Sequence, residues 1–292
     1  MTSLHARVAS ADAYQLGEGP VWDGDRSRIL WVDILAGKVM EGILDGDEVV
    51  VTATENLGGM VSAAVPTNSG AILLALQEEL AVLEPGGELR RGARIVSAGS
   101  GDRCNDGAVD PAGRFLVGTL ALRETDTAQR LLRVEHDGTV TTIDDDLTLS
   151  NGLAWSPDGN LLYSVDTLSR RIRVRDYDPG TGEVGERREH LSFDDGYPDG
   201  ICVDADGCLW IAVWGAGEVR RFSRDGAQLE SVKVPAPHVS SVALVGADLD
   251  RLLITTAREG LTHDELATNP LSGHLFSVRV GTVGLATPPA VL

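Results

Sequence analysis

The sequence predicts an all-β fold, a six-bladed β-propeller. Short apolar runs are separated by turns rich in Asp, Pro and Gly, as in the turn at 155–159 (WSPDG) before the run at 161–166 (LLYSVD). This pattern is typical of β-hairpins. It recurs six times, in units that begin near residues 18, 61, 105, 151, 199 and 240. A repeat of about 40–50 residues with four short strands is typical of a propeller blade.

Each unit is expected to contribute one hairpin beside the central channel and further strands outside it. The expected inner hairpins span 18–33, 61–76, 105–119, 151–166, 199–213 and 240–256. A two-sheet sandwich also uses many short strands, but it does not produce this near-constant repeat. We expect residues 1–292 to form a single propeller domain, closed by pairing of 7–10 with 274–278 and without a helix of ordinary length.

The composition excludes several classes of partner. Lys and Arg number 25 against 44 Asp and Glu, a formal charge of −19, and such a surface repels nucleic acid and anionic lipid. An acidic, solvated surface accounts for most of this charge. The three cysteines lack regular spacing, and neither a secretory leader nor an apolar run of ~18 residues is visible. We therefore expect a cytoplasmic protein that acts on a small molecule, with its oligomeric state left open.

Four polar residues occupy the same place in four of the units, and they are Glu18, Asn105, Asn151 and Asp199. Equivalent positions in a propeller surround one axis, so these side chains are expected at one mouth of the central channel. Carboxylates held together repel each other, and a bound cation relieves that repulsion. The alternative is that these residues form ordinary turns. Their equivalence across repeats favours a metal site.

The chemistry of these side chains narrows the choice of metal. Oxygen ligands favour Ca²⁺, Mg²⁺ or Mn²⁺, while Zn²⁺ and Fe(II) also accept carboxylates and stay open. Three or four protein ligands leave positions for water and substrate, as catalysis requires. Arg103, two residues before Asn105, is expected either to hold a substrate oxygen or to pair with a carboxylate such as Asp102 or Asp106.

Four segments of the chain, in the same order, resemble one protein family. They are LGEGPVWD at 16–23, RCNDGAVDPAGRFLVGT at 103–119, SNGLAWSPDGNLLYSVDT at 150–167 and PDGICVDADGCLWIAVWG at 198–215. The chain resembles the family of senescence marker protein (regucalcin), gluconolactonases and luciferin-regenerating enzyme from about residue 14 to about residue 256. The resemblance implies a six-bladed propeller with one divalent cation in the central channel.

The resemblance also implies roles for individual residues. Glu18, Asn151 and Asp199 match the metal ligands, and Asp199 also matches a proposed general base. Arg103 and Asn105 match residues that contact the substrate. The implied activity is hydrolysis of a sugar lactone to the aldonic acid, with water activated either by Asp199 or by the cation. Two alternatives stay open, namely hydrolysis of other activated esters such as organophosphates, and a non-catalytic calcium-binding propeller.

One segment departs from the family pattern. After the strand that ends at Thr119, some members carry a carboxylate that contacts sugar hydroxyls, where this chain has Leu122 and Arg123. Glu124 is the nearest replacement, so the identity of the lactone is left open. His238, just before the sixth unit, is expected either in a loop or lining the pocket.

Overall fold

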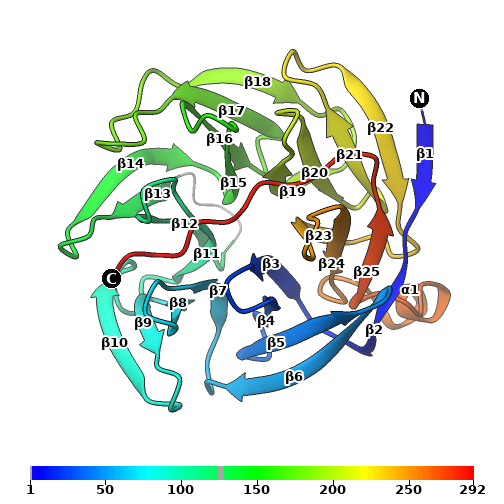
Figure 1. Ribbon diagram of the computed structural model, residues 1–292, viewed down its shortest axis with the longest axis horizontal. Coiled ribbons are helices and arrows are strands. Elements are labelled where there is room, and N and C mark those ends of the chain that lie inside the picture. The colour runs from blue at the N-terminus through cyan, green and yellow to red at the C-terminus, as the bar shows by residue number, and fades with distance from the viewer. Residues whose placement is uncertain (1, 124–127) are drawn as a thin grey trace.

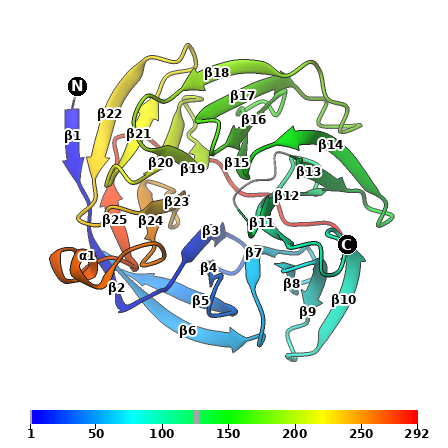
Figure 2. The same cartoon turned by 180° about the vertical axis from the view of Figure 1, so that it is seen from behind.

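The computed structural model describes residues 2–123 and 128–292 and confirms the six-bladed propeller. Six sheets stand around one axis, seen end-on in Figure 1 and from behind in Figure 2. In each sheet the first strand of the repeat unit lies nearest the axis, and its neighbours follow outward. The first strands therefore line the central channel.

Blades one to three use strands in chain order. Blade one contains β3 (Gly17–Asp23), β4 (Arg28–Asp33), β5 (Lys38–Asp45) and β6 (Glu48–Asn56). Blade two contains β7 (Val61–Pro66), β8 (Ile72–Leu76), β9 (Glu79–Leu83) and β10 (Leu89–Arg94). Blade three contains β11 (Asp102–Val109), β12 (Phe115–Ala121), β13 (Gln129–Val134) and β14 (Val140–Leu147).

Blade four also uses strands in chain order, whereas blades five and six include the two N-terminal strands. Blade four contains β15 (Ser150–Trp155), β16 (Leu161–Asp166), β17 (Arg171–Asp176) and β18 (Arg188–Ser192). Blade five contains β19 (Tyr197–Val203), β20 (Leu209–Trp214), β21 (Glu218–Phe222), β22 (Gln228–Lys233) and the parallel strand β1 (Thr2–His5). Blade six contains β23 (Val239–Val245), β24 (Arg251–Thr256), β25 (His274–Arg279) and β2 (Arg7–Ala13).

Pairing of β2 with β25 closes the ring, as the sequence predicts. Arg7 lies opposite Ser277, and Val8 lies opposite Phe276. Between β24 and β25 the chain forms α1 (His263–Thr268), a single short helix capped by Thr262. No helix in the two described ranges is long and apolar enough to cross a bilayer.

The apolar core lies between neighbouring blades. Trp210 of blade five and Phe276 of blade six are completely buried in one cluster that joins the two blades. Burial of a large side chain contributes roughly 1.5–3 kcal/mol. Because these interfaces stabilise the ring, the channel on the axis does not need to be filled with apolar side chains.

Several buried carboxylates close turns. Asp204 has no exposed surface, and its Oδ1 accepts hydrogen bonds from the backbone amides of Asp206 (3.0 Å) and Cys208 (2.9 Å). Its Oδ2 accepts from Trp210 Nε1 at 3.0 Å and from the Arg221 guanidinium. This acid thus has enough partners to remain buried, so part of the acidic composition has a purely structural use.

The C-terminal residues cross one end of the channel, as the red segment in Figure 1 shows. One end of this strap, defined as residues 283–291, is held by the bond from Ala205 N to the Val283 carbonyl at 2.8 Å. The other end is held by the bond from Ala290 N to the Pro66 carbonyl at 2.8 Å. The strap therefore links blade five to blade two across the axis.

Candidate functional site

The position shared by the repeats is a β-bulge in every blade. The pairing of each innermost strand with its neighbour shifts register at this position or directly beside it. A bulge leaves a residue out of the ladder and redirects its side chain. The six residues, called the channel ring below, are Glu18, Ser62, Asn105, Asn151, Asp199 and Ser240, and all are buried.

The ring corrects one detail of the repeat alignment. The spacing of the units places Val61 at the shared position of blade two, but the register slip follows Val61, which still pairs with Leu76. Ser62, directly after it, is the ring residue, because its Oγ bonds to the backbone carbonyl just before the next ring member, as Ser240 Oγ does. A serine in this place carries no sequence signal of its own, although the matching serine of blade six, Ser240, indicates the equivalence.

The glycines after Asn151 and Asp199 allow neighbouring blades to approach closely. A Cβ atom on Gly152 would lie 2.5 Å from the Asp199 carbonyl oxygen, and one on Gly200 would lie 2.1 Å from Ser241 Oγ. Neither distance is compatible with a side chain. The Asn-Gly and Asp-Gly pairs thus belong to bulged strands packed against each other, and the alternative of ordinary turns does not describe them.

Three ring side chains connect one blade to the next. Each donates a hydrogen bond to the backbone carbonyl of the residue just before the next ring member, which ties adjacent innermost strands together. The bonds run from Ser62 Oγ to Cys104 O (2.6 Å), from Asn105 Nδ2 to Ser150 O (2.9 Å) and from Ser240 Oγ to Gly17 O (2.6 Å).

Asn151 makes the same connection through an intermediary. Its Nδ2 donates to Thr167 Oγ1 at 3.2 Å, and Thr167 Oγ1 donates to the Pro198 carbonyl at 2.9 Å. Its Oδ1 is buried without a hydrogen-bond partner among the described residues, as is Oδ1 of Asp199. An unpaired buried polar atom costs roughly 1–3 kcal/mol. Two such oxygens on adjacent ring members are what we expect of cation ligands.

The two carboxylates of the ring cannot donate a connecting bond when ionised. Glu18 Oε2 accepts only from the Gly19 amide at 2.9 Å among the bonds of the described chain. Burial, followed by the neighbouring Asp106 carboxylate, raises the pKa of Glu18 to about 8. Burial and then the charge of Glu18 raise the pKa of Asp199 well above its usual range. The positive charge of Arg103 lowers both pKa values but offsets only part of these increases, so negative charge at this point of the ring is incompletely compensated.

Asn105 differs from Asn151 because both ends of its amide are engaged. Its Nδ2 holds the Ser150 carbonyl, and its Oδ1 accepts from Arg103 Nη1 at 2.9 Å. The same Nη1 donates to the Cys104 carbonyl at 2.8 Å. Arg103 is 5% exposed, and burial lowers its pKa to about 10, opposed by the charge of Glu18. The Arg103 guanidinium is therefore held near the carboxylates of Glu18 and Asp199, while its hydrogen bonds go to other groups.

A divalent cation fits the remaining oxygens. Among residues 2–123 and 128–292, no group of three or more Asp, Glu, His or Cys side chains is arranged to hold a metal. The candidate set instead combines two carboxylates, Glu18 and Asp199, with the amide oxygen of Asn151. An all-oxygen set with two unpartnered buried atoms suits Ca²⁺, Mg²⁺ or Mn²⁺.

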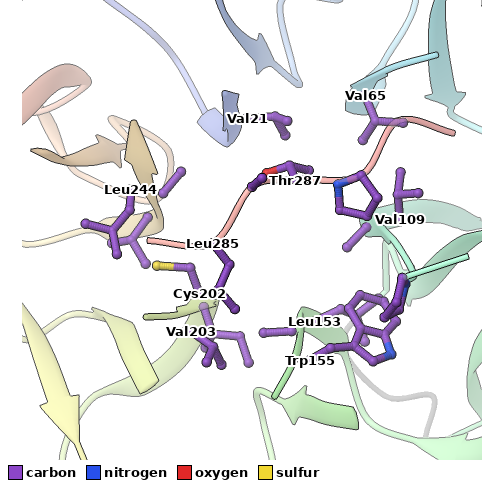
Figure 3. Close-up of a pocket in the computed structure, with 18 of the residues that line it drawn as sticks. Val21, Val65, Val109, Leu153, Trp155, Cys202, Val203, Leu244, Leu285 and Thr287 are labelled. Atoms are coloured by element: carbon purple, nitrogen blue, oxygen red, sulfur yellow. The ribbon is translucent and has the colours of Figure 1, made fainter. Parts of the chain in front are cut away.

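Beyond the ring, on the side of the strap, the channel contains a cavity of about 560 Å³. Its lining begins with residues that follow the ring on their strands, such as Gly19 and Asp106, and continues with apolar side chains. Figure 3 shows Val21, Val109 and Trp155 around this space, with Leu285 of the strap. The polar ring and the apolar half of the channel are thus separate environments.

In the segment that departs from the family pattern, the two described residues are exposed. Leu122 is 47% exposed, and Arg123 is also exposed. Glu124 lies outside the described residues. Two further residues act on the ring that the sequence does not identify as site residues. Besides burial, Asp106 raises the pKa of Glu18, but in the sequence it is only the neighbour of a ring member. Thr167 accepts a hydrogen bond from Asn151, a contact that forms only on folding.

Comparison with known proteins agrees with this architecture. The family described as "SMP-30/Gluconolactonase/LRE-like region" matches residues 16–258. Regucalcin of Danio rerio is 34% identical over 295 residues, covering 99% of this chain and 98% of the relative. The 6-deoxy-6-sulfogluconolactonase of Pseudomonas putida is 37% identical over 283 residues, covering 94% of each chain.

Solved structures show the same fold. The calcium-binding protein regucalcin from Agrobacterium tumefaciens superposes with a TM-score of 0.93 at 30% identity over 100% of both chains. A luciferin-regenerating enzyme superposes with a TM-score of 0.90 at 27% identity, covering 98% of this chain and 100% of the other. The chain therefore belongs to the SMP-30/gluconolactonase/LRE-like family.

Proposed function

We propose that this protein is a metal-dependent lactonase that opens a sugar lactone to the aldonic acid. The observation that carries the proposal is the pair of unpartnered buried oxygens, Asn151 Oδ1 and Asp199 Oδ1, beside the buried carboxyl group of Glu18 with its raised pKa. Lactone hydrolysis in general is supported by relatives named 6-deoxy-6-sulfogluconolactonase and pentonolactonase, at 37% and 34% identity. The dependence on a metal and the choice of a sugar lactone as substrate are our proposals.

Glu18, Asn151 and Asp199 would hold the cation. When bound, it supplies positive charge that polarises a carbonyl oxygen and stabilises an oxyanion. Calcium is our first choice among the oxygen-preferring metals, since a structural relative at 30% identity is described as a calcium-binding protein. The three-ligand set leaves room for substrate, which favours a catalytic role over a purely structural one.

The protein groups divide the remaining chemistry. The buried guanidinium of Arg103 stands beside Asn105 and would orient the lactone by donating hydrogen bonds to its oxygens. Asp199 would accept the proton of the water that attacks the lactone carbonyl. The ring C–O bond then breaks, the leaving alkoxide takes up a proton, and the aldonic acid is released.

The experiment is lactone turnover measured as acid release at constant pH. Activity is expected in the metal-loaded protein, loss after EDTA treatment, and recovery when Ca²⁺, Mg²⁺ or Mn²⁺ is added back. Asn151→Ala should also lose activity, with a β-type circular dichroism spectrum as evidence of folding. Full activity in the chelated protein would contradict the metal-dependent mechanism.

A further inference from the structure

His238 stands across the channel mouth from Arg103. Both residues lie two positions before a ring member, Arg103 before Asn105 and His238 before Ser240. They belong to blades three and six, and their strands β11 and β23 lie on opposite sides of the axis in Figure 1. Because the cavity toward the strap is lined by residues that follow the ring, His238 lies on the other side of the ring from that cavity.

Few of the residues two positions before a ring member have polar side chains. Two positions before the ring, the six blades carry Leu16, Met60, Arg103, Leu149, Tyr197 and His238. Four of these are apolar or aromatic, and only Arg103 and His238 bear nitrogen. Arg103, a hydrogen-bond donor, and His238 are therefore the two nitrogen-bearing side chains at this position of the repeat, in opposite blades.

The His238 ring is held in place on two sides. It stacks on Trp214, with ring centroids 4.1 Å apart and an interplanar angle of 15°. Its Nδ1 lies 2.8 Å from the backbone carbonyl of Glu259. A carbonyl only accepts, so Nδ1 carries the proton and Nε2 presents a lone pair. Burial lowers the pKa of His238, which favours the neutral ring.

The Nε2 atom has no partner within the described parts of the chain. This atom is not fully buried, whereas Nε2 of His190 is buried and has no hydrogen bond. His238 thus offers an oriented, accessible acceptor at the mouth. Sugar hydroxyls are the donors that such an acceptor selects, whereas an unsubstituted lactone provides none.

We propose that His238, positioned by Trp214 and Glu259, accepts a hydrogen bond from a hydroxyl group of the lactone and so determines preference for hydroxylated lactones. The proposal rests on the lactonase function proposed above and assigns specificity within that site. A site built to pair with a substrate hydroxyl rejects analogues that lack it, because its own polar atom then stays unpaired.

The test compares two lactones and two substitutions. His238→Asn keeps a donor for the Glu259 carbonyl but removes the acceptor at Nε2, whereas His238→Gln restores an oxygen near that position. With D-glucono-1,5-lactone, His238→Asn is expected to lower kcat/KM by about 5- to 100-fold, and His238→Gln to recover most of it. With δ-valerolactone, which has no hydroxyl, both variants should stay within about twofold of wild type.

The matched control is His190→Asn. His190 packs on Tyr163 in blade four, with ring centroids 5.2 Å apart. This substitution should not change kcat/KM for either lactone. Equal losses for both lactones in His238→Asn, or no loss for gluconolactone, would overturn the specificity role.

Binding of D-gluconate, measured by calorimetry, separates this inference from the proposed function. Gluconate carries the same hydroxyls, so its binding should weaken about 5- to 100-fold in His238→Asn even if no lactone is turned over. Unchanged gluconate binding overturns the role of His238. Absence of lactone turnover in the wild type with weakened gluconate binding in the variant contradicts the lactonase function alone.

Discussion

Replacing Glu18 by Gln is expected to stabilise the metal-free protein while it abolishes metal binding. Glu18 is 7% exposed, and burial together with the Asp106 carboxylate raises its pKa from 4.5 to about 8. Glutamine has nearly the same shape and carries no charge. The substitution therefore removes the electrostatic penalty of the empty site and, with it, a proposed ligand.

The size of the effect follows from the two pKa values. Between pH 4.5 and about 8 the folded protein keeps a proton on Glu18 that the unfolded chain has released. Stability therefore falls as pH rises through this window, by about 1.36 kcal/mol per pH unit. At pH 7, which is about 2.5 units above the unfolded pKa, the penalty is about 3 kcal/mol. For a chain of this length that corresponds to roughly 5–10 °C in Tm.

The assay is urea and thermal unfolding of EDTA-treated wild type and Glu18→Gln at pH 5.5, 6.5 and 7.5. The advantage of the variant should grow by about 1.4 kcal/mol for each pH unit. Added Ca²⁺ should stabilise the wild type, by mass action, but not Glu18→Gln. Glu55→Gln, which replaces an exposed acid on β6, is the matched control and should behave like the wild type in both the pH series and the Ca²⁺ titration. Equal stability of Glu18→Gln and wild type at pH 7.5 without metal would refute this reasoning.

Three further outcomes are expected. Ser240→Ala leaves the Gly17 carbonyl unpaired, so the free energy of unfolding should fall by about 1–3 kcal/mol in urea titrations, with lactone KM unchanged; an unaltered stability would mean that the bond carries no weight. Asp199→Asn should lower kcat at least about 100-fold in acid-release assays without altering the circular dichroism spectrum, and near-normal turnover would contradict its role as base. Deletion of 284–292 should open the apolar end of the channel and increase binding of a fluorescent apolar dye while kcat/KM is retained; unchanged dye binding would show that the strap does not cover the cavity.

The fold could be predicted largely from the sequence because it depends on local signals. Turns such as Asp204–Gly207 recur at a nearly constant spacing, and the side chain of Asp204 closes its own turn by bonds to nearby amides. Ring closure by β2 was also predicted and is confirmed by the pairing of Arg7 with Ser277. A single domain over residues 1–292 and a cytoplasmic location stay predictions.

The different roles of the site residues could not be predicted from residue types. Asn105 and Asn151 are the same residue in the same repeat position, yet only Asn105 has both amide ends satisfied. The difference arises from the contact of Asn105 with Arg103 and from the placement of Thr167 next to Asn151. Such contacts depend on side-chain orientation after folding, which repeat spacing does not encode.

The ring itself provides a physical argument for function. Four of its six members connect to the next blade, Asn151 through Thr167, and the connections that are lacking start at Glu18 and Asp199. Gln and Asn would supply donors at these two positions and remove the buried charge. The chain instead carries two carboxylates with raised pKa values, at a cost to the metal-free fold. Local destabilisation of this kind is typical of a functional site, and a bound cation is the ligand that would reverse it.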